Sequence, residues 1–495
     1  QHPCGISEVT ILSHFKSSAF ENLVYQRRRM KKQTLLNKLK TATTLCCAVF
    51  TAGGVMAQSS NNDSSLEKWW NGKGLVQGSG NPIFDARQSL EDHGLKMTGK
   101  YNGAFYGILD SQNGSHGLWD QEIVFGADLN FGKLLGVEAL EGTKAFSNFR
   151  WRDPSPYSNP NEYVEAQSMF NPSHYQSGTQ FRVLSFGLEY STKDLLPVKD
   201  MVVVRGGWMR PQQEFIQQPL SKLFLNNAIE SAKGVGGNIP FSSSFSTWGG
   251  TLEIKPHELL YIKNGLFMSF PQATSSTNHG LAFQGYAPDT DLNGLLYMGE
   301  AGFTPKIGES KLEGKYAFGG YFYGTPENQT RTWSNNYVDG RYGFYFQADQ
   351  MLYREPSAPV ASSKPSDGKS FKEVVPAEKP KLSKQGLSTF NLITMAPGYA
   401  RSNNFPFYFQ TGLVYTGLIP GRDQDSTQIA FGYGAYQGDV NTPPKTYTAV
   451  LEAAYSVQLN GWAFIRPYFQ YLINPQGNNT VANSAILGFS TGLTF

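Results

Sequence analysis

The C-terminal part of the chain alternates between apolar and polar side chains with a period of two. In residues 446–459, every odd position from Tyr447 to Val457 is apolar, whereas the even positions are mostly polar, among them Glu452. Because successive side chains of a β-strand point to opposite faces, we predict a strand with one apolar and one polar face. The last ten residues, which end on Phe495, repeat the pattern.

The same alternation recurs in residues 342–354, 405–417, 428–436 and 462–473. Two folds explain it. In a soluble β-sandwich the apolar face packs inward, whereas in a membrane barrel it faces lipid and aromatic residues gather at the strand ends. Aromatic residues near the predicted strand ends favour the barrel: Tyr447, Tyr455, Phe469, Tyr471 and Phe495.

The connections between these segments alternate between short turns and longer polar loops, which is typical of a membrane barrel. Residues 153–178 and 211–245 are long and rich in turn-forming residues, so we expect them to fold partly into the lumen. Residues 354–385 are rich in Pro, Ser and Lys and are predicted to form a flexible loop. Counting strands back from the C-terminus places this loop on the periplasmic side. We therefore predict an all-β chain forming a transmembrane antiparallel β-barrel with long loops partly folded into the lumen.

The N-terminal residues have the features of a secretory signal peptide. Met30 is followed by lysines, then by an apolar run at 45–55 and by small residues ending at Ala57. We therefore expect residues 1–29 to be a non-native upstream extension and residues 30–57 to be a signal peptide. Residues 58–89 would then form an N-terminal periplasmic segment and residues 90–495 the barrel.

Cleavage after Ala57 would change the composition of the mature chain. All three cysteines (Cys4, Cys46 and Cys47) precede that site. The 438 remaining residues carry 34 Lys and Arg against 37 Asp and Glu, so the charge becomes slightly negative and argues against a nucleic-acid partner. They contain no apolar run of the ~18 residues that a membrane-spanning helix needs.

Several ordered motifs resemble the carbohydrate-selective porin family of bacterial outer membranes (OprB-type). They are Leu-Glu-Asp-His-Gly-Leu at 90–95, Leu-Asn-Asn-Ala-Ile at 225–229, Ile-Pro-Phe-Ser-Ser-Ser-Phe at 239–245, Thr-Trp-Gly at 247–249, Asn-His-Gly at 278–280, the stretch 343–356, Gly-Leu-Ile-Pro-Gly-Arg-Asp-Gln-Asp at 417–425 and the stretch 466–475. The resemblance covers about residues 85–495. It implies a barrel of about 16 strands and diffusion of sugars such as glucose through a central channel.

The odd or even position of a residue along a predicted strand, its parity, indicates whether its side chain faces the lumen or the lipid. Selectivity in a channel comes from its width and from the groups lining its narrowest point, and sugars offer hydroxyls to hydrogen-bonding and aromatic side chains. As pore-lining or substrate-contacting residues we predict Arg150, Trp151, Arg152, Arg205, Arg341, Tyr345, Gln347, Asp349, Glu452, Arg466, Tyr468 and Gln470. Alternatively, individual members of this set brace the wall through ion pairs.

One segment matches the ligand spacing of a calcium-binding loop. Asp289, Asp291, Asn293 and Glu300 supply the oxygen-bearing positions, with Gly294 at the turn. Residues 295–303 are predicted to be a strand, so Glu300 is alternatively a wall residue. Beyond this candidate site we expect no cofactor. We also predict no enzymatic activity, because the histidines lack metal-ligand spacing and there is no Gly-x-Ser-x-Gly motif.

These features lead to one function and two alternatives. We expect an integral outer-membrane porin that lets monosaccharides or small oligosaccharides diffuse passively through a water-filled channel. Its other partners would be outer-membrane lipid and the barrel-assembly machinery, which would engage the C-terminal strand ending at Phe495, and a homotrimer is a candidate assembly. The alternatives are a general or ion-selective porin and a secreted, soluble, β-rich polysaccharide-binding protein.

Overall fold

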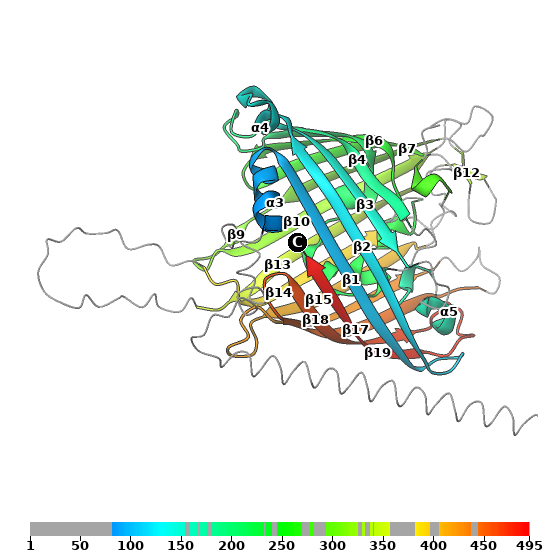
Figure 1. Ribbon diagram of the computed structural model, residues 1–495. Helices are drawn as coiled ribbons and strands as arrows, with labels where there is room; N and C mark the ends of the chain where they lie inside the picture. Colours follow the sequence, from blue (N-terminus) through cyan, green and yellow to red (C-terminus); the bar gives the residue numbers. More distant parts are fainter. Residues whose placement is uncertain are drawn as a thin grey trace, which may run out of the picture.

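A computed structural model describes residues 82–153, 159–166, 168–175, 181–231, 233–239, 245–269, 277–281, 294–324, 329–331, 337–339, 341–356, 382–396, 405–436 and 444–494. In these ranges the chain forms a closed antiparallel barrel (Figure 1). The wall strands are β1 (Leu95–Asp110), β2 (His116–Asn130), β3 (Thr143–Arg152), β4 (Phe181–Ser191), β5 (Val202–Met209), β6 (Thr247–His257), β7 (Leu260–Ser269), β8 (Gly294–Phe303), β10 (Leu312–Gly324), β13 (Arg341–Arg354), β14 (Gly386–Met395), β15 (Phe407–Thr416), β16 (Ser426–Ala435), β17 (Tyr447–Gln458), β18 (Ala463–Ile473) and β19 (Ser484–Thr494).

The strands pair in sequence order around the ring, and β1 pairs with β19 to close it. The sheet has 17 strands, but β9 (Lys306–Ile307) only extends the edge between β8 and β10. Sixteen of the described strands therefore form the wall, as the family resemblance implied. A separate hairpin joins β11 (Gln329–Arg331) to β12 (Tyr337–Asp339).

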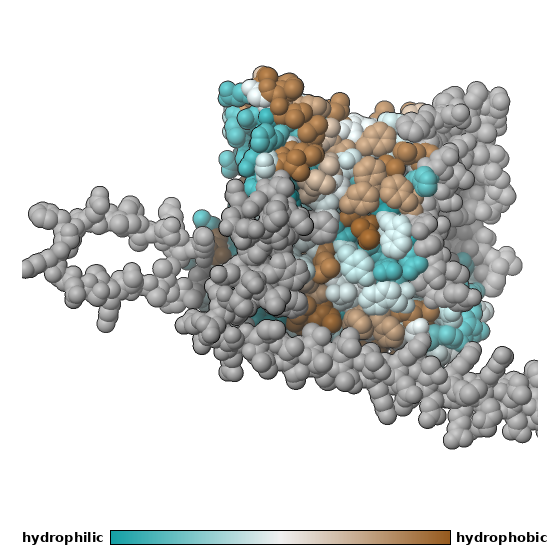
Figure 2. All heavy atoms as spheres, in the orientation of Figure 1, coloured by the Kyte–Doolittle hydropathy of each residue, from teal (hydrophilic) through white to brown (hydrophobic). Residues whose placement is uncertain are grey.

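The two faces of the wall differ as the alternation predicted. On β19, Leu487 is 44% exposed on the outside, whereas Ser490 is fully buried on the inside. Figure 2 shows apolar and aromatic side chains over the wall on the face that it presents. Exposed apolar side chains recur on the outer rows of other strands, including Ile123, Phe125, Leu266 and Phe344. The barrel therefore has an apolar exterior, as a strand-built wall in lipid requires.

Helix α3 (Pro82–Asp92) precedes β1 at one end of the barrel, which we call the short-turn end (Figure 1). The connections at this end include 192–201, 258–259, 304–311 and 459–462 and the turn that holds α4 (Phe131–Leu135) and η2 (Glu138–Leu140). The 355–385 connection joins β13 to β14 at this same end, although residues 357–381 lie outside the described ranges. The long connections 153–180, 210–246 and 270–293 lie at the opposite end.

Two of the long connections pack inside the barrel. The first holds α5 (Pro160–Val164) and η4 (Ser168–Phe170), and the second holds α6 (Pro211–Phe215), η5 (Pro219–Leu223), α7 (Asn227–Glu230) and α8 (Lys233–Gly236). The 270–293 connection carries η7 (Thr277–Gly280). The prediction that long loops fold into the lumen is confirmed for the described parts.

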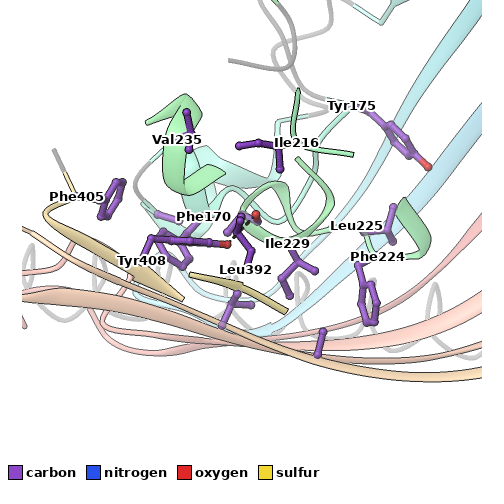
Figure 3. Packing of buried hydrophobic residues seen from close by; sticks show 14 of the residues in the cluster. Phe170, Tyr175, Ile216, Phe224, Leu225, Ile229, Val235, Leu392, Phe405 and Tyr408 are labelled. Carbon is purple, nitrogen blue, oxygen red and sulfur yellow. Dashed lines mark hydrogen bonds between the residues drawn. The ribbon is translucent and has the colours of Figure 1, made fainter. Parts of the chain in front are cut away.

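The main apolar cluster lies between these inserted loops and the inner face of the wall. Phe170, Ile229 and Val235 come from the loops and meet Leu392 and Tyr408 from β14 and β15 (Figure 3). The Tyr408 hydroxyl also donates to the carbonyl oxygen of Ala228 at 2.9 Å. Apolar residues on the inner rows of these strands therefore pack against the loops and not against water. Among the described helices, none is both long and apolar enough to cross a bilayer.

Candidate functional site

The inserted 210–246 loop is fixed to the wall by a buried carboxylate on β17. The two oxygens of Glu452 accept hydrogen bonds from the backbone N–H groups of Leu225 and Asn226, each at 2.8 Å. Glu452 is fully buried, and hydrogen bonds to the charged form are the ones that best offset the cost of burying it. Glu452 thus faces inward, as predicted, and holds a loop.

A second attachment involves Gln218, which precedes η5. Its Nε2 donates to Asp349 Oδ1 at 2.9 Å and to the carbonyl oxygen of Asn391 at 2.8 Å. Its Oε1 accepts from Gln410 Nε2 at 3.0 Å. One buried amide on the loop therefore links three adjacent strands, β13, β14 and β15. The predicted residue Asp349 is one of its partners.

Arg205 belongs to an inward row of ion pairs. It contacts Glu189 of β4 at 3.0 Å and Glu214 of α6 at 2.8 Å. Lys144 of β3 continues the row to Glu189 at 3.2 Å, and Lys263 of β7 reaches Glu214 at 3.8 Å. The alternating charges tie α6 to the β3–β7 wall, so Arg205 has the bracing role that was the alternative to direct pore lining.

Tyr345 and Gln347 of β13 meet around Glu300 of β8. The Glu300 carboxylate accepts from Tyr261 at 2.6 Å, from Tyr345 at 2.8 Å and from Gln347 Nε2 at 2.6 Å. Gln347 also donates to the carbonyl oxygen of Phe215 in α6 at 3.2 Å. Glu300 is therefore a wall residue whose oxygens have three protein donors.

The other candidate calcium ligands, Asp289, Asp291 and Asn293, lie outside the described ranges. Within those ranges no cluster of three or more His, Cys, Asp or Glu side chains has the geometry to hold a metal ion.

The predicted residues of β18 contact both inserted loops and the neighbouring wall. Arg466 donates to the carbonyl oxygen of Leu223 at 2.6 Å. Gln470 donates to the carbonyl oxygen of Pro172 in the 153–180 loop at 3.0 Å. Tyr468 donates to the carbonyl oxygen of Phe105 across the barrel seam at 2.9 Å. All three face inward, as parity predicted.

The opposite wall, β1 to β4, carries an inward group of charged side chains that we call the lumen cluster: Lys100, Glu122, Arg150, Arg152 and Arg182. Arg152 forms an ion pair with Glu122 at 2.9 Å, and Asn102 donates to the same carboxylate at 3.0 Å. Arg150 lies opposite Arg182 in the β3–β4 register. The cluster holds four cations and one carboxylate, and its balance stays positive when Asp120, on the same inward row of β2, is added.

The inserted loops bring further charges towards the lumen cluster. Lys222 contacts Glu230 at 3.0 Å. Burial by itself would raise the pKa of Glu230, but His174, Lys222 and the Ser231 hydroxyl outweigh it and pull that pKa well below its ordinary value. Burial also lowers the pKa of His174. Because that shift disfavours a charged His174, Lys222 and the Ser231 hydroxyl are the partners that keep the Glu230 carboxylate charged.

Lys233, at the start of α8, interacts electrostatically both with Glu230 and Lys222 of the inserted loop and with Arg150 and Arg152 of the lumen cluster. Burial lowers its pKa to about 8, Glu230 opposes that shift, and repulsion from Arg152, Lys222 and Arg150 adds to it. Arg152 and Arg150 thus lie within electrostatic reach of Lys233, while α8 itself packs against β14 and β15. The inserted loop is therefore attached to the β13–β18 wall and carries the buried charges of Glu230 and Lys233.

Two predicted residues have other placements. Trp151 is paired with Ile123, which is 39% exposed on the outer row, so it does not share the inward row of Arg150 and Arg152. The backbone of Arg341 pairs with Tyr323 at the long-loop end of β13, and its side chain lies outside the described set.

Several inward groups were not identified from sequence: Lys100, Asp120, Glu122, Arg182, Glu214 and Gln218. Asp120 accepts a hydrogen bond from Ser173 of the 153–180 loop at 2.5 Å. Asp120 and Glu122 are two residues apart in β2 and therefore share one face. Applying the period-two alternation to residues 116–130 would have identified both as inward. Glu214 lies in the short helix α6 and Gln218 directly precedes η5, so neither belongs to a strand whose alternation would indicate its direction.

A closed sixteen-stranded barrel with an apolar exterior, polar inward groups and inserted loops has the architecture of a bacterial outer-membrane porin. The description "Carbohydrate-selective porin, OprB family" matches residues 120–495. The chain therefore belongs to this family and is an integral outer-membrane β-barrel. Family and fold are those of a channel. The soluble polysaccharide-binding alternative is accordingly not retained.

One of the similar solved structures supports the same fold. The high-pH structure of Pseudomonas putida OprB has a TM-score of 0.67 and 19% identity, covering 83% of this chain and 96% of that one. The low-pH structure of the same protein has a TM-score of 0.48 and 16% identity, covering 85% and 98%. Salmonella typhi OmpF in complex with daunomycin has a TM-score of 0.46 and 10% identity, covering 81% and 99%. No curated protein matches the chain by sequence.

Proposed function

We propose that the chain lets small sugars diffuse passively across the outer membrane, with the solute gradient as the only driving force. The path that we propose runs between the inserted 210–246 loop and the lumen cluster on β1–β4. The observation that carries this proposal is the asymmetry of the lumen. The loop is hydrogen-bonded to the β13–β18 wall through Glu452 and Gln218, whereas the charged donors of the opposite wall face its other side.

The chemistry of the lumen cluster suits a polyhydroxylated solute. Guanidinium groups donate in fixed directions to sugar hydroxyl oxygens, and a carboxylate such as Glu122 accepts from sugar hydroxyl groups. Of the residues predicted from sequence, Arg150 and Arg152 belong to this proposed path. We assign Arg205, Asp349, Glu452, Arg466 and Gln470 to fixing the width of the path through the inserted loops.

The positive balance of the lumen cluster favours one alternative, an anion-selective or general porin. Fixed cationic side chains raise the local concentration of anions and lower that of cations. A channel of this kind would pass small anions without distinguishing sugars from other neutral solutes of the same size.

Permeation into liposomes separates the two functions. With purified full-length protein, we expect glucose to enter faster than a neutral amino acid of similar size, and Arg150→Met to reduce that difference. Lys199→Met, which changes an exposed turn residue at the short-turn end, is the control and should leave both rates unchanged. Equal rates for the sugar and the amino acid, together with a reversal potential that favours anions, would replace the sugar-selective proposal with the anion-selective one.

Two partner predictions remain proposals. Recognition by the barrel-assembly machinery is proposed to use β19 and the terminal Phe495, which itself lies outside the described ranges. Assembly as a homotrimer is proposed on the sequence-based expectation alone.

A further inference from the structure

Buried polar side chains surround a small residue on the inner face of the barrel seam, where β1 pairs with β19. Ala104 of β1 is paired with Asp120 of β2 on one side and with Ser490 of β19 on the other. Asn102 and Tyr106 precede and follow it on the same inward row of β1. Asn102 is 2% exposed and the others are fully buried. We call the four polar residues the seam quartet: Asn102, Tyr106, Asp120 and Ser490.

Each member of the seam quartet has an oxygen atom without a hydrogen-bond partner in the described part of the chain. Asn102 donates through Nδ2 to Glu122 at 3.0 Å, so its Oδ1 is the atom that remains. Asp120 Oδ2 accepts from Ser173 at 2.5 Å, so its Oδ1 remains. The hydroxyl groups of the other two members supply the remaining atoms. A buried polar atom without a hydrogen bond is costly, so four in one place indicate a bound polar molecule.

The oxygens of the seam quartet converge from both sides of β1. A Cβ atom at Gly492, which is paired with Asn102, would lie 3.2 Å from Asn102 Oδ1. The amide oxygen therefore leans from β1 towards β19, where Ser490 is two residues from Gly492 on the same face. From the β2 side, Asp120 acts electrostatically on the Tyr106 phenol. The quartet thus surrounds the space above the central methyl group of β1.

The width of this space suits one small molecule. Directly paired residues have Cβ atoms about 5 Å apart, so the Cβ atoms of Asp120 and Ser490 are separated by about 10 Å across Ala104. Two short side chains do not span that distance with one hydrogen bond, but two hydrogen bonds of about 2.8 Å through a bridging molecule do. Gly488 and Gly492, on either side of Ser490 in the inward row of β19, add no side chain that would fill the space.

We propose that an internal water molecule lies above Ala104 and is hydrogen-bonded to all four members of the seam quartet. The Tyr106 and Ser490 hydroxyl groups each bring a donor hydrogen, whereas Asn102 Oδ1 and Asp120 Oδ1 are acceptors. A water molecule accepts two hydrogen bonds and donates two, so it satisfies all four groups at once.

The same count argues against a metal ion at this place. A cation would bind the oxygens and leave both hydroxyl hydrogens without an acceptor. Arg152 also acts electrostatically on Asp120, so the carboxylate already has a positive group nearby and a second cation would be repelled. Water is therefore the ligand that the donors, the acceptors and the charge favour.

The water would join parts of the barrel that are not neighbours in the sheet. Asp120 lies on β2 and Ser490 on β19, and β1 separates the two strands. The bridge therefore crosses the seam at which the barrel closes. Because Asp120 also accepts from Ser173, the water fixes the orientation of the carboxylate that holds the 153–180 loop. This structural role does not depend on which solute the channel passes.

A crystal structure of the purified full-length chain, at a resolution that shows ordered water, tests the site directly. We expect a peak above the Ala104 methyl group, within about 2.6–3.2 Å of at least three of the four oxygens. A second crystal soaked in rubidium chloride should give no anomalous peak there. A space without density, a direct hydrogen bond between members of the quartet, or a rubidium peak would overturn the proposal.

A pair of substitutions of the same shape gives a second test. In Ala104→Thr the added hydroxyl takes the place of the water, whereas Ala104→Val fills the space without a polar atom. We expect Ala104→Val to lower the temperature at which the folded form disappears from unheated gels by a few degrees more than Ala104→Thr.

Ala430 provides the control for this pair. It is also buried on the inner face and is paired with Glu452, whose two oxygens already accept from backbone N–H groups. Ala430→Thr should therefore have no advantage over Ala430→Val. Equal shifts for the two Ala104 variants, or the same advantage of Thr at Ala430, would contradict the water site. The crystallographic test uses the unchanged chain and decides the question if the Ala104 variants fail to fold.

Discussion

At the residue scale, Glu452 illustrates how an inward polar side chain acquires a structural role. Its strand position predicts that it faces the lumen, and it does. The two N–H groups that it binds, those of Leu225 and Asn226, are 227 and 226 residues away in sequence. The carboxylate therefore determines where the 210–246 loop crosses the lumen, although it lies on the wall.

Replacing Glu452 by Gln tests this role with little change in shape. The amide has one acceptor oxygen, so one backbone N–H of the loop would face an NH2 group and lose its partner. We expect the free energy of unfolding to fall by about 1–3 kcal/mol and the single-channel current to become noisier as the loop loosens. Planar-bilayer recordings and thermal unfolding measure the two effects.

Glu313→Gln is the matched control for this substitution. Glu313 is exposed at the short-turn end of β10, so the same chemical change there should leave both the current and the unfolding unaltered. Equally quiet channels in Glu452→Gln and Glu313→Gln would mean that other contacts hold the loop.

At the element scale, the short helices of the inserted loop depend on the barrel for their stability. Helices α6, α7 and α8 contain five, four and four residues, far below the length at which an isolated helix is stable in water. Asn226 caps α7 by accepting from the N–H of Ala228 at 3.0 Å. The same side chain donates to the carbonyl oxygen of Phe170 at 3.1 Å. The loop elements thus form only where the wall and the second loop support them.

The charge of α8 gives the channel a pH dependence. Because burial lowers the pKa of Lys233 to about 8, this lysine is mostly protonated at pH 7 and mostly neutral at pH 9. We expect any preference for anions to weaken as the pH rises from 7 to 9. In Lys233→Met the preference should stay constant over this range. Reversal potentials in a KCl gradient provide the measurement, and an unchanged reversal potential for the native chain would contradict the assignment.

The stability of the fold should change with pH in a defined direction as well. The folded-state pKa of Lys233 lies below the unfolded value of about 10.4. Between the two values the unfolded chain binds more protons, so stability rises with pH there. The contribution of this group is therefore unfavourable below pH 8 and is relieved between about pH 8 and 10.

At the scale of the whole molecule, closure of the barrel depends on a close approach at the seam between β1 and β19. Gly488 pairs with Tyr106 on one side and Tyr468 on the other. The rings of these two tyrosines meet with their centroids 5.8 Å apart. A Cβ atom at Gly488 would contact the carbonyl oxygen of Phe105 and would lie 2.8 Å from the Tyr468 hydroxyl oxygen. Only glycine fits at this position without movement of the seam.

Gly488→Ala should therefore destabilise the whole barrel. We expect a loss of about 1–3 kcal/mol, the usual effect of overpacking a filled site, and a lower temperature at which the folded form disappears from unheated gels. Gly461→Ala makes the same chemical change in a turn where a Cβ would contact nothing within 4 Å, and it should behave like the native chain. Equal transition temperatures for the two variants would show that the seam accommodates the methyl group.

The alternation that identifies a wall strand is clear in some parts of the sequence and absent in others, for a physical reason. Strands near the C-terminus have polar or small inward rows, so their alternation is clear in the sequence. In β1 the inward residues Ala104, Tyr106 and Ile108 are apolar and fully buried, because they belong to the core that the inserted loops complete. Both faces of that part of β1 are therefore apolar, and the alternation that identifies a lumen face disappears.

The sequence by itself determined the all-β class, the alternation of an apolar outer row with an inward row, the family, and the inward direction of residues such as Glu452, Arg466 and Gln470. Side-chain period depends only on local backbone geometry, so parity is encoded in short segments. Only the tertiary structure decided which inward groups hold loops and which form the lumen cluster, whereas the outer position of Trp151 follows from its place between the inward Arg150 and Arg152. Those roles depend on contacts between residues that lie hundreds of positions apart, such as that between Leu225 and Glu452, and no local pattern contains them.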